Sequence, residues 1–546
     1  MESTMMDYPL TLPHILERAG RYFPKAQIVS RLPDKSLHRT TYREFHRRAK
    51  ALAESLCKAG LKKGDRVATL MWNHYAHHEA YFGIPAAGGV LHTLNLRLHP
   101  NDLEYIVNNA GDRFLIVDDV LLPVLEQFRS RANFERVFVV NHSGARLPAG
   151  LEDYNDLLAT ATGEFAYPRI EEREASGMCY TSGTTGRPRG VVYSHRSTVL
   201  HSYNCVLASS MHIAASDVVV PVVPMFHANA WGIPYATTMM GASLVFPGPY
   251  LDGESLLNLF ESENVTLSAG VPTVWLAVLQ LLEREPTRWK LAKGLRLAVG
   301  GSAAPESMIR AFDRLGITVL HAWGMTETSP VATVATLKPE MERLSADERY
   351  AYRAKQGYAM PFVEMRVVSD DGKEVASDGK AMGEIQVRGP YITGKYFGME
   401  PTPDKFTADG WLRTGDVATI DEEGYIRITD RTKDLIKSGG EWISSVDLEN
   451  AIMGHPAVAE AAVIAIPDPK WDERPLAVIV LKEGARASAG DINRFLEGKF
   501  AKWWLPDEYV FAESIPRTST GKFLKSALRE TYGKRGAGAA AKSKVG

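Results

Sequence analysis

Tyr180-Thr-Ser-Gly-Thr-Thr-Gly-Arg-Pro-Arg-Gly190 is the most informative stretch of this chain, since two glycines and four small hydroxyl residues precede Arg-Pro-Arg-Gly. A loop of this composition bends tightly and presents backbone N–H groups and hydroxyls to a polyanionic phosphate. It is not a Walker A loop, because no Gly-Lys-Ser/Thr follows the glycines at the required spacing. Taken alone, the stretch is equally compatible with a solvent-exposed connection. The rest of the sequence therefore has to decide between the two interpretations.

Five further motifs follow this loop in order along the chain. They are His321-Ala-Trp-Gly-Met-Thr-Glu327, Trp411-Leu-Arg-Thr-Gly-Asp416, Asp430-Arg-Thr-Lys-Asp434, Lys437-Ser-Gly-Gly-Glu-Trp442 and Pro516-Arg-Thr-Ser-Thr-Gly-Lys522. The ordered set resembles the adenylate-forming superfamily of acyl-CoA ligases, nonribosomal adenylation domains and luciferases. The resemblance extends from about residue 10 to residue 532, which is nearly the whole chain.

Two stretches carry a closer likeness within that superfamily. Val222-Val-Pro-Met-Phe-His-Ala-Asn-Ala-Trp231 and Gly439-Gly-Glu-Trp-Ile-Ser-Ser-Val446 are most similar to bacterial medium- and long-chain fatty acyl-CoA ligases. Related bacterial 3-(methylthio)propionyl-CoA ligases share this likeness.

Composition sets the broad class of protein. A chain of 546 residues is too long for one ordinary core, so at least two domains are expected. A hydrophobic content of 45% and a charged content of 23% are typical of soluble globular proteins. The net charge of −2 provides no long-range field for nucleic acid or an anionic membrane, so we expect no nucleic-acid partner.

Cysteine usage and hydropathy bear on location. The chain has only three cysteines, Cys57, Cys179 and Cys205, which form neither a disulfide framework nor a metal-binding spacing. Reduced thiols of this kind indicate a cytoplasmic protein. The N-terminus lacks a basic region followed by an apolar stretch, so it is not a secretory signal. No uninterrupted apolar run reaches the ~20 residues of a transmembrane helix.

Hydrophobic periodicity in the first half of the chain alternates between the two kinds of secondary structure. It predicts helices over residues 12–23 and 42–59, and strands over 66–71, 113–118, 136–141, 218–223, 242–246 and 295–301. Strands separated by helices favour parallel α/β layers, with ligands at the carboxyl ends of the strands.

The pattern changes after residue 357. Strands over 365–368 and 383–389 predict a small β-rich subdomain, and a further strand covers 424–430. Residues 434–532 form a compact α+β pattern, with a helix over 446–453 and strands over 458–466 and 476–481.

The fold class expected from these patterns is α/β. A large N-terminal domain of layered α/β sheets with the β-rich subdomain covers residues 1–432. A small mobile α+β domain covers 433–546, with a disordered tail from about residue 533. The family resemblance makes Lys433 the hinge between the two domains, although no Gly/Pro-rich linker marks it.

The resemblance implies a reaction in two steps. A carboxylate attacks the α-phosphate of ATP to give an acyl-adenylate and pyrophosphate, and a thiol then displaces AMP. Both steps build up negative charge, so catalysis requires positioning together with stabilisation by cations and N–H groups. The expected cofactors are ATP, Mg²⁺ and coenzyme A.

By resemblance, the opening stretch cradles the β- and γ-phosphates through Thr181, Ser182, Gly183, Thr184, Thr185 and Gly186. Arg189 stands where the family normally has Lys; it keeps the charge but is larger and less flexible. Thr326 and Glu327 follow a turn expected at Gly324, and Glu327 and Thr181 are the expected Mg²⁺ ligands. Without the surrounding motif, Thr326 and Glu327 would read as an ordinary helix start.

The adenosine site implied by the resemblance is spread over several motifs. Trp323 is the aromatic wall for adenine, although a core role is its plain alternative. Asp416 accepts hydrogen bonds from the two ribose hydroxyls, and Arg431 contacts the nucleotide; a simple turn and a solvated charge are the alternatives. The other expected contacts are Gly301, Ser302, Ala303, His321, Ala322, Gly324, Met325 and Ile428.

Two further parts of the site depend on the C-terminal domain. The ammonium of Lys522 would stabilise the adenylation transition state, whereas an exposed lysine is usually only solvated; Lys525 lies nearby but off the motif. The coenzyme A contacts are Lys437, Gly439, Gly440, Glu441 and Trp442, and a tight turn is the alternative reading. By resemblance, this loop faces the active site only in the thioester-forming state, after the C-terminal domain has rotated.

The acyl pocket is expected around His227, Trp231, Gly301, Trp323 and Gly324, with His227 also among the catalytic residues. Trp231 resembles the gate of a fatty-acid tunnel, although a core role is equally open for Trp231 and Trp275. No Asp or Arg marks this pocket. An apolar acyl tail is therefore favoured over an amino acid, which argues against a nonribosomal adenylation domain.

The sequence thus predicts an ATP-dependent acyl-CoA ligase, an acid–thiol ligase acting on a medium- or long-chain fatty acid. Its open alternatives are a ligase for 3-(methylthio)propionate or another short acid, an acyl-AMP ligase that loads a carrier protein, and a non-catalytic nucleotide-binding regulator. The likeness to the fatty-acyl enzymes also implies a homodimer.

Overall fold

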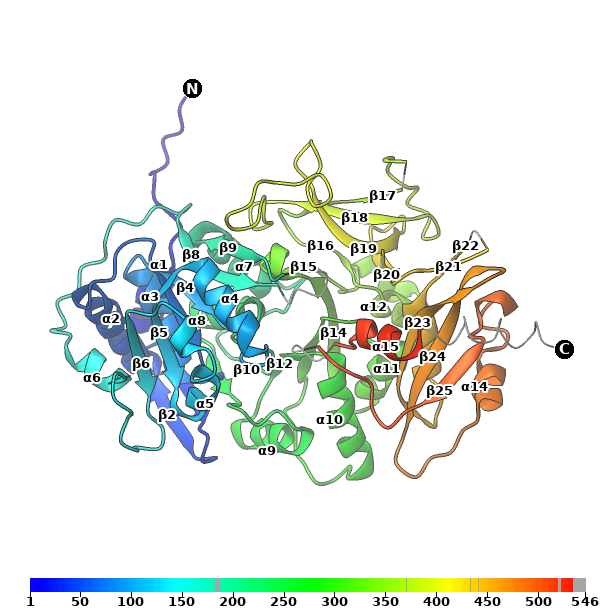
Figure 1. Cartoon of the computed structure of the whole chain (residues 1–546), viewed down its shortest axis with the longest axis horizontal. Helices are drawn as coiled ribbons and strands as arrows, with labels where there is room; N and C mark the ends of the chain where they lie inside the picture. The colour runs from blue at the N-terminus through cyan, green and yellow to red at the C-terminus, as the bar shows by residue number, and fades with distance from the viewer. Residues whose placement is uncertain (182–186, 370, 433, 440, 519–521, 534–546) are drawn as a thin grey trace.

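The computed structural model describes residues 1–181, 187–369, 371–432, 434–439, 441–518 and 522–533. The described residues form four sheets, two large ones up to residue 359 and two smaller ones after them (Figure 1). The α/β fold class is confirmed. The predictions for Ser182 to Gly186, Lys433, Gly440 and the tail beyond residue 533 lie outside the described residues.

The first large sheet has nine strands and supplies most of the residues that surround the site described below. Its strands β10 to β14 run parallel, and β15 pairs antiparallel with β14. In spatial order the strands are β16 (Tyr358–Ala359), β15 (Val331–Val334), β14 (Thr318–Gly324), β13 (Arg296–Val299), β12 (Leu267–Gly270), β10 (Val218–Pro221), β11 (Ser243–Phe246), β1 (Gln27–Arg31) and β2 (Leu37–Thr41).

The second large sheet has seven strands, and its last pair, β8 and β9, is antiparallel. The glycine-rich stretch therefore connects the two strands of a hairpin, and not a strand to a helix as in a Walker A loop. In spatial order the strands are β7 (Glu152–Asp153), β6 (Arg136–Val140), β5 (Asp112–Asp118), β3 (Arg66–Leu70), β4 (Val90–Thr93), β8 (Ala175–Tyr180) and β9 (Gly190–Ser194).

Helices between the two large sheets bury the largest core. It contains apolar residues of α1 (Leu12–Tyr22), α2 (Tyr42–Lys58), α3 (Tyr75–Ala86), α7 (His195–Val206) and α8 (Ile233–Met240) together with strand residues of both sheets. In α2 the side chain of Thr41 caps the N-terminus, and Phe45, Ala49, Leu52 and Leu56 form the buried stripe. The helical spacing of apolar residues in the sequence therefore corresponds to the buried face of α2.

The outer faces of the large sheets are covered by other helices. The nine-stranded sheet packs against α9 (Gly253–Glu263), α10 (Pro272–Arg284) and α11 (Glu306–Arg314), and α12 (Ala346–Ala354) lies beside α11. The seven-stranded sheet packs against α4 (Pro100–Ala110) and α5 (Leu122–Leu125). Helix α6 (Tyr154–Ala159) lies against α2.

The two smaller sheets follow. One has four antiparallel strands, β17 (Glu364–Val368), β18 (Met382–Arg388), β19 (Leu412–Ile420) and β20 (Ile426–Arg431). The other contains β22 (Glu441–Ile443), β21 (Ile436–Ser438), β24 (Asp472–Leu481) and β23 (Val458–Asp468), with β25 (Glu508–Phe511) beside β24. Its faces are covered by α13 (Ser445–Met453) and α14 (Ala489–Leu496) on one side and by α15 (Lys525–Tyr532) on the other.

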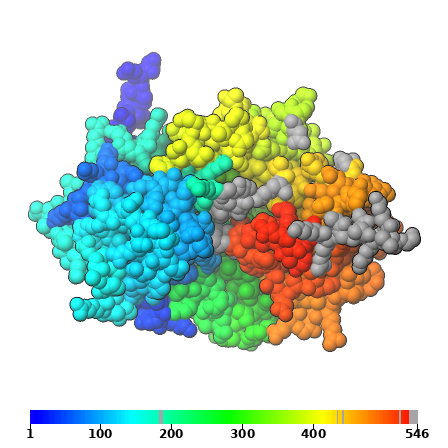
Figure 2. Space-filling model, in the orientation of Figure 1, coloured from blue at the N-terminus to red at the C-terminus, as the bar shows by residue number. Residues whose placement is uncertain are grey.

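These C-terminal elements, orange and red in Figure 2, close against the green and yellow parts of the chain. Within the described part of the chain, no helix is both long enough and apolar enough to cross a bilayer.

Candidate active site

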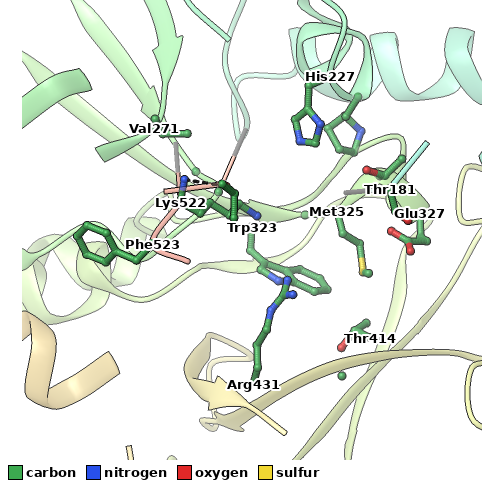
Figure 3. Close-up of a pocket in the computed structure, with 18 of the residues that line it drawn as sticks. Thr181, His227, Val271, Trp323, Met325, Glu327, Thr414, Arg431, Lys522 and Phe523 are labelled. Atoms are coloured by element: carbon green, nitrogen blue, oxygen red, sulfur yellow. Dashed lines mark hydrogen bonds between the residues drawn. The ribbon is translucent and has the colours of Figure 1, made fainter. Parts of the chain in front are cut away.

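Two adjoining cavities open where the nine-stranded sheet, the four-stranded sheet and the C-terminal elements meet. Their volumes are about 460 and about 200 Å³, and Gly301, Trp323, Arg431 and Lys522 line both. In Figure 3 Thr181 and Glu327 lie on one side of the larger cavity and Lys522 on the opposite side, with Trp323 and Arg431 between them. The strand ends of the main sheet thus face the cavities, as parallel α/β topology predicts.

Most of the residues singled out from the sequence line one or both cavities. They are Thr181, Arg189, His227, Trp231, Gly301, Ser302, Ala303, His321, Ala322, Trp323, Gly324, Met325, Thr326, Glu327, Asp416, Ile428, Arg431 and Lys522. Lys437, Gly439 and Trp442 do not line them. Glu441 belongs to β22, and its side chain lies outside the described residues.

The glycine-rich stretch is closed at its base by a pair of hydrogen bonds. The Thr181 N–H donates to the Arg189 carbonyl oxygen at 2.9 Å, and the Arg189 N–H donates to Thr181 Oγ1 at 3.1 Å. Strand β9 then leads directly into α7, whose first turn has a capping box between Ser194 and Ser197. Both ends of the stretch are therefore held, and both face the larger cavity.

Glu327 lies in a short 3₁₀ turn, Thr326–Thr328, immediately after β14. The hydroxyl of Tyr193 donates to the Thr326 carbonyl at 2.8 Å, and the Thr393 N–H donates to the Glu327 carbonyl at 2.8 Å. The Glu327 residue is only 6% exposed. A carboxylate buried to this degree requires a cation or several hydrogen-bond donors.

Trp323, Asp416 and Arg431 form one connected unit. The Trp323 Nε1–H donates to Asp416 Oδ2 at 2.8 Å, and Arg431 Nε lies 3.1 Å from Asp416 Oδ1. The negative charge of Asp416 raises the pKa of Arg431, which is therefore charged. Each Asp416 oxygen keeps lone-pair capacity for a further donor. An indole face beside a fixed carboxylate suits an aromatic base joined to a diol.

The loop after β13 is shaped for close approach. Gly301 has φ +84°, and a Cβ there would lie 3.2 Å from Val271 and 3.4 Å from Lys522 Cε. His321 Nε2 accepts the Ala304 N–H at 3.2 Å, while its Nδ1–H donates to the Ala354 carbonyl at 3.1 Å. Burial lowers the pKa of His321 to about 4, so the neutral ring makes both bonds. His321 thus fixes the loop.

Lys522 enters the cavity from the C-terminal elements. Its N–H donates to Thr518 Oγ1 at 3.1 Å, and its carbonyl accepts the Thr518 N–H at 2.7 Å. Burial, and then the charge of Arg431, lowers the pKa of Lys522 to about 8, although Asp416 and Glu327 act in the opposite direction. This ammonium is therefore desolvated, and a negatively charged ligand would stabilise it.

An unusual left-handed turn supports the other wall. Four consecutive non-glycine residues, Ala228 to Trp231, have φ between 43° and 57°. Such conformations typically cost about 1–2 kcal/mol per residue, and strain of this kind gathers at functional sites. The turn sets the Trp231 indole against Gly300, where a Cβ would lie 3.0 Å from the ring. The pKa of His227, at the start of the turn, is lowered to about 4 by burial and then by Lys522.

Trp275 has a different place from Trp231. It is fully buried in the core between α9, α10 and the nine-stranded sheet, and it lines neither cavity. The core alternative is therefore correct for Trp275, because α10 turns this residue toward α9.

Lys437 and Trp442 lie on β21 and β22 of the small C-terminal sheet and Gly439 follows β21, and none of the three lines either cavity. Lys437 Nζ lies 4.6 Å from the Trp442 ring centroid, and the Gly439 N–H donates to the Trp471 carbonyl at 2.7 Å. The structure thus brings Lys522, and not this loop, to the cavity.

Comparison with known proteins assigns the family. Residues 16–397 match the AMP-binding enzyme family, and residues 447–522 match the AMP-binding enzyme C-terminal domain. The chain belongs to the AMP-binding enzyme family. It is 53% identical over 533 residues to a long-chain-fatty-acid–CoA ligase of Thermus thermophilus, covering 97% of each chain.

Two further known proteins are similar to this chain over nearly their whole length. A 3-methylmercaptopropionyl-CoA ligase of Ruegeria lacuscaerulensis is 44% identical, with 97% of this chain and 99% of the relative covered. The crystal structure of ATP-bound MatB from Rhodopseudomonas palustris has a TM-score of 0.80 at 26% identity, with 96% and 100% covered.

Members of the AMP-binding family use ATP with Mg²⁺, and the residues present fit a hard cation. Among the described residues, the Glu327 carboxylate accepts one side-chain hydrogen bond, from the Tyr396 hydroxyl to Oε1 at 2.7 Å. Its second oxygen is left for a ligand on the side of the cavity that it lines. An anionic oxygen beside a phosphate-binding stretch is the donor that Mg²⁺ prefers.

A second group of possible metal ligands lies elsewhere, at His74, Asp118 and His142. His74 Nδ1 accepts the Ala76 N–H at 3.2 Å, which places the ring proton on Nε2. That proton is donated to Asp118 Oδ1 at 2.7 Å. Because a metal would need the lone pair of the same nitrogen, the geometry favours a hydrogen-bonded pair over a metal centre.

The sequence reasoning missed several residues that line the larger cavity, among them Tyr396 and Arg187. Tyr396 contacts both Glu327 and Arg189, and Arg187 lies 5.1 Å from the ring centroid of Tyr105. The run Gly394-Lys-Tyr-Phe-Gly398 was a possible signal, since aromatic residues between two glycines are unusual in a plain surface turn.

Proposed function

We infer that this protein is an ATP-dependent acyl-CoA ligase. It activates a carboxylic acid as the acyl-adenylate with release of pyrophosphate, and then transfers the acyl group to coenzyme A with release of AMP. The observation that carries the proposal is the meeting of Lys522 with Glu327, Trp323 and Asp416 around two adjoining cavities, although these residues come from distant parts of the chain.

Each group has a role that follows from its position. Trp323 and the loop at Gly301 hold adenine, and Asp416 accepts from the ribose. Thr181 and Arg189 bind the outer phosphates, and Glu327, with Thr181, would hold Mg²⁺, which neutralises phosphate charge. The Lys522 ammonium stabilises the negative charge that develops at the α-phosphate during attack. His227, neutral at pH 7, contributes by packing beside the carboxylate rather than by charge.

For the acyl group, we propose a medium- or long-chain fatty acid. The wall that carries His227 also contains Val223, Pro224, Ala228, Trp231 and Val271, and none of these side chains is charged at pH 7. An apolar wall favours an apolar tail. A short acid such as 3-(methylthio)propionate is the second candidate, favoured by the 44% identity to a ligase for that class of acid.

We propose that residues 1–432 and 433–546 are the two domains and that rotation near Lys433 exchanges Lys522 for the loop at Lys437. Polar contacts between residues 1–432 and 433–546 support a defined orientation of the second domain, the one in which Lys522 lines the cavity. The Ser445 N–H donates to Asp430 Oδ2 at 2.8 Å, and Arg427 pairs with Asp447 at 2.6 Å. An engineered disulfide between β20 and α13 should preserve acyl-AMP formation and block thioester formation; equal loss of both would count against rotation.

A cytoplasmic location and a homodimer complete the proposal. All three cysteines are free thiols, as in a reducing compartment. Light scattering coupled to size-exclusion chromatography tests the dimer, and a monomer at micromolar concentration would exclude it.

The decisive experiment measures CoA-dependent AMP formation across acids from acetate and 3-(methylthio)propionate to palmitate. A clear optimum that Lys522→Ala abolishes would establish the ligase and its chain length. Lys373→Ala, at an exposed turn, is the matched control. Acyl-adenylate without thioester would indicate transfer to a carrier protein instead, and ATP binding without pyrophosphate release would indicate a regulator.

A further inference from the structure

The segment between β18 and β19, residues 389–411, ties together two parts of the phosphate side of the cavity. The Phe397 N–H donates to the Gly190 carbonyl at 2.8 Å, at the end of the glycine-rich stretch. The Thr393 N–H donates to the Glu327 carbonyl at 2.8 Å. Tyr396 lies between these two anchors, so its backbone position is fixed with respect to both.

The Tyr396 side chain contacts the anionic and the cationic groups of this region at once. Its hydroxyl donates to Glu327 Oε1 at 2.7 Å, and Arg189 Cζ lies 5.2 Å from its ring centroid. The ring packs edge-on against Phe406, with centroids 6.0 Å apart. Tyr396 is only 6% exposed, so water does not compete for these contacts.

The hydroxyl makes the two oxygens of Glu327 unequal, because Oε1 already accepts a hydrogen bond and the other oxygen is therefore the better ligand for a cation. A carboxylate with two free oxygens can bind a cation through either or both. Mg²⁺ requires near-octahedral geometry and commonly takes one oxygen from each carboxylate. Hydrogen-bond donors outside the ligand set orient such carboxylates. The Tyr396 hydroxyl is the donor in this contact, because a carboxylate oxygen 2.7 Å away can only accept.

The ring face serves Arg189 in a different way. A planar guanidinium stacks on an aromatic ring, whereas a lysine ammonium is a compact point charge that needs no such platform. Arg189 is the position where this chain departs from the lysine of the resembled family. An aromatic ring beneath the guanidinium limits the freedom of the longer side chain.

We propose that Tyr396 is a positioning residue for the metal–nucleotide complex: its hydroxyl selects the Glu327 oxygen that binds Mg²⁺, and its ring supports Arg189 at the phosphates. This inference rests on the proposed function only in assuming that MgATP occupies the cavity. In this role Tyr396 acts through Glu327 and Arg189. Its effect is therefore on nucleotide and metal affinity.

Calorimetric titration of the full chain with ATP, with and without Mg²⁺, tests the two contacts separately. Tyr396→Phe keeps the ring and removes only the hydroxyl. It should reduce the Mg²⁺-dependent gain in ATP affinity by about 10-fold and leave metal-free ATP binding unchanged. Tyr396→Leu should also weaken metal-free ATP binding, by about 3- to 5-fold, through loss of the platform. Direct Mn²⁺ binding, followed by electron paramagnetic resonance, provides a readout independent of turnover.

Tyr391→Phe is the matched control, since it removes a buried hydroxyl of the same segment that bonds to Asn204 and Pro361 and not to Glu327. It should change neither titration. If Tyr396→Phe fails to fold, Glu327→Gln gives the second measurement: the Mg²⁺-dependent gain should fall at least as far.

The possible outcomes are distinguishable. An unchanged Mg²⁺ dependence in Tyr396→Phe, or an equal loss in Tyr391→Phe, overturns the role of Tyr396 while the ligase proposal stands. No loss of the gain in Glu327→Gln also overturns it. A wild-type chain that binds no ATP overturns both proposals. If the protein binds MgATP normally but forms no AMP, only the ligase proposal is overturned. The ATP titrations of the Tyr396 variants then still test the role of Tyr396.

Discussion

Raising the pH from 7 to 9 should slow acyl-adenylate formation because Lys522 loses its proton in this range. The pKa of Lys522 in the free enzyme is about 8, lowered mainly by burial and then by Arg431. The ammonium is the active form in the proposed mechanism. An amine with a pKa of about 8 is protonated in about 90% of the chains at pH 7 and in about 10% at pH 9. The positive charge of Lys522 is therefore largely lost over this range.

The assay should follow pyrophosphate release without coenzyme A. The thiol of coenzyme A ionises near the ordinary thiol pKa of about 8.5. Its ionisation would mask the alkaline fall of the pH–rate profile (the alkaline limb) that we assign to Lys522. The kcat/KM for ATP should fall about 10-fold between pH 7 and 9, because this constant reports the free enzyme. The limb in kcat should lie at higher pH, since bound phosphates stabilise the ammonium.

Lys522→Arg is the internal reference for this limb. A guanidinium stays charged throughout the range, so whatever activity the variant retains should be independent of pH between 7 and 9. His227, whose pKa is about 4, stays neutral and adds nothing to the limb. A flat wild-type profile to pH 9.5, or the same limb in Lys522→Arg, would refute the assignment of charge stabilisation to Lys522.

Three further outcomes are expected. Gly324→Ala would place a Cβ 1.9 Å from the Pro330 carbonyl oxygen; it should lower the melting temperature by several degrees and abolish ATP binding, whereas Gly394→Ala, with open space around it, should not. Asp416→Asn should weaken ATP binding by about 10-fold in calorimetry, because a charged acceptor for the ribose is lost and Arg431 is left unpaired. Lys525→Met should reduce the free energy of unfolding by about 3–5 kcal/mol in urea, because it strands the buried charge of Glu449, 2.7 Å from Lys525 Nζ; a loss below 1 kcal/mol would contradict the ion pair's role.

Individual helices and strands of this protein can be predicted from the sequence because the patterns that specify them lie within a few neighbouring residues. The helix expected over residues 42–59 is α2, Tyr42–Lys58, and the strand expected over 113–118 lies within β5, Asp112–Asp118. Apolar spacing, a threonine cap and β-branched runs act within a few residues and need no knowledge of the fold. The division of the N-terminal strands into two sheets was not readable, because the patterns of β3 and β13 do not say which strands they pair with.

Tyr396 shows the same limit at the site. Its sequence neighbours are turn residues, and no local rule connects it with Glu327, which lies 69 residues earlier. The contact exists because the segment after β18 crosses to Gly190, the first residue of β9. Trp231 and Trp275 are a second case: both are plausible pocket residues in the sequence, and only α10's packing against α9 assigns one of them to the core.

The sequence by itself determined the chemistry, because the phosphate-binding composition, the acid after Gly324 and the terminal Gly-Lys turn are residue types in a fixed order. The Gly-Lys motif also selected Lys522 over Lys525, three residues further on, and only the tertiary structure decided which groups surround each lysine. Both lysines line the two cavities, but Lys525 begins α15 and pairs with Glu449, whereas Lys522 precedes that helix and lies against the loop at Gly301. The burial of a lysine and the charged groups beside it depend on contacts between segments that are distant in the chain. The order of residues alone does not give those contacts.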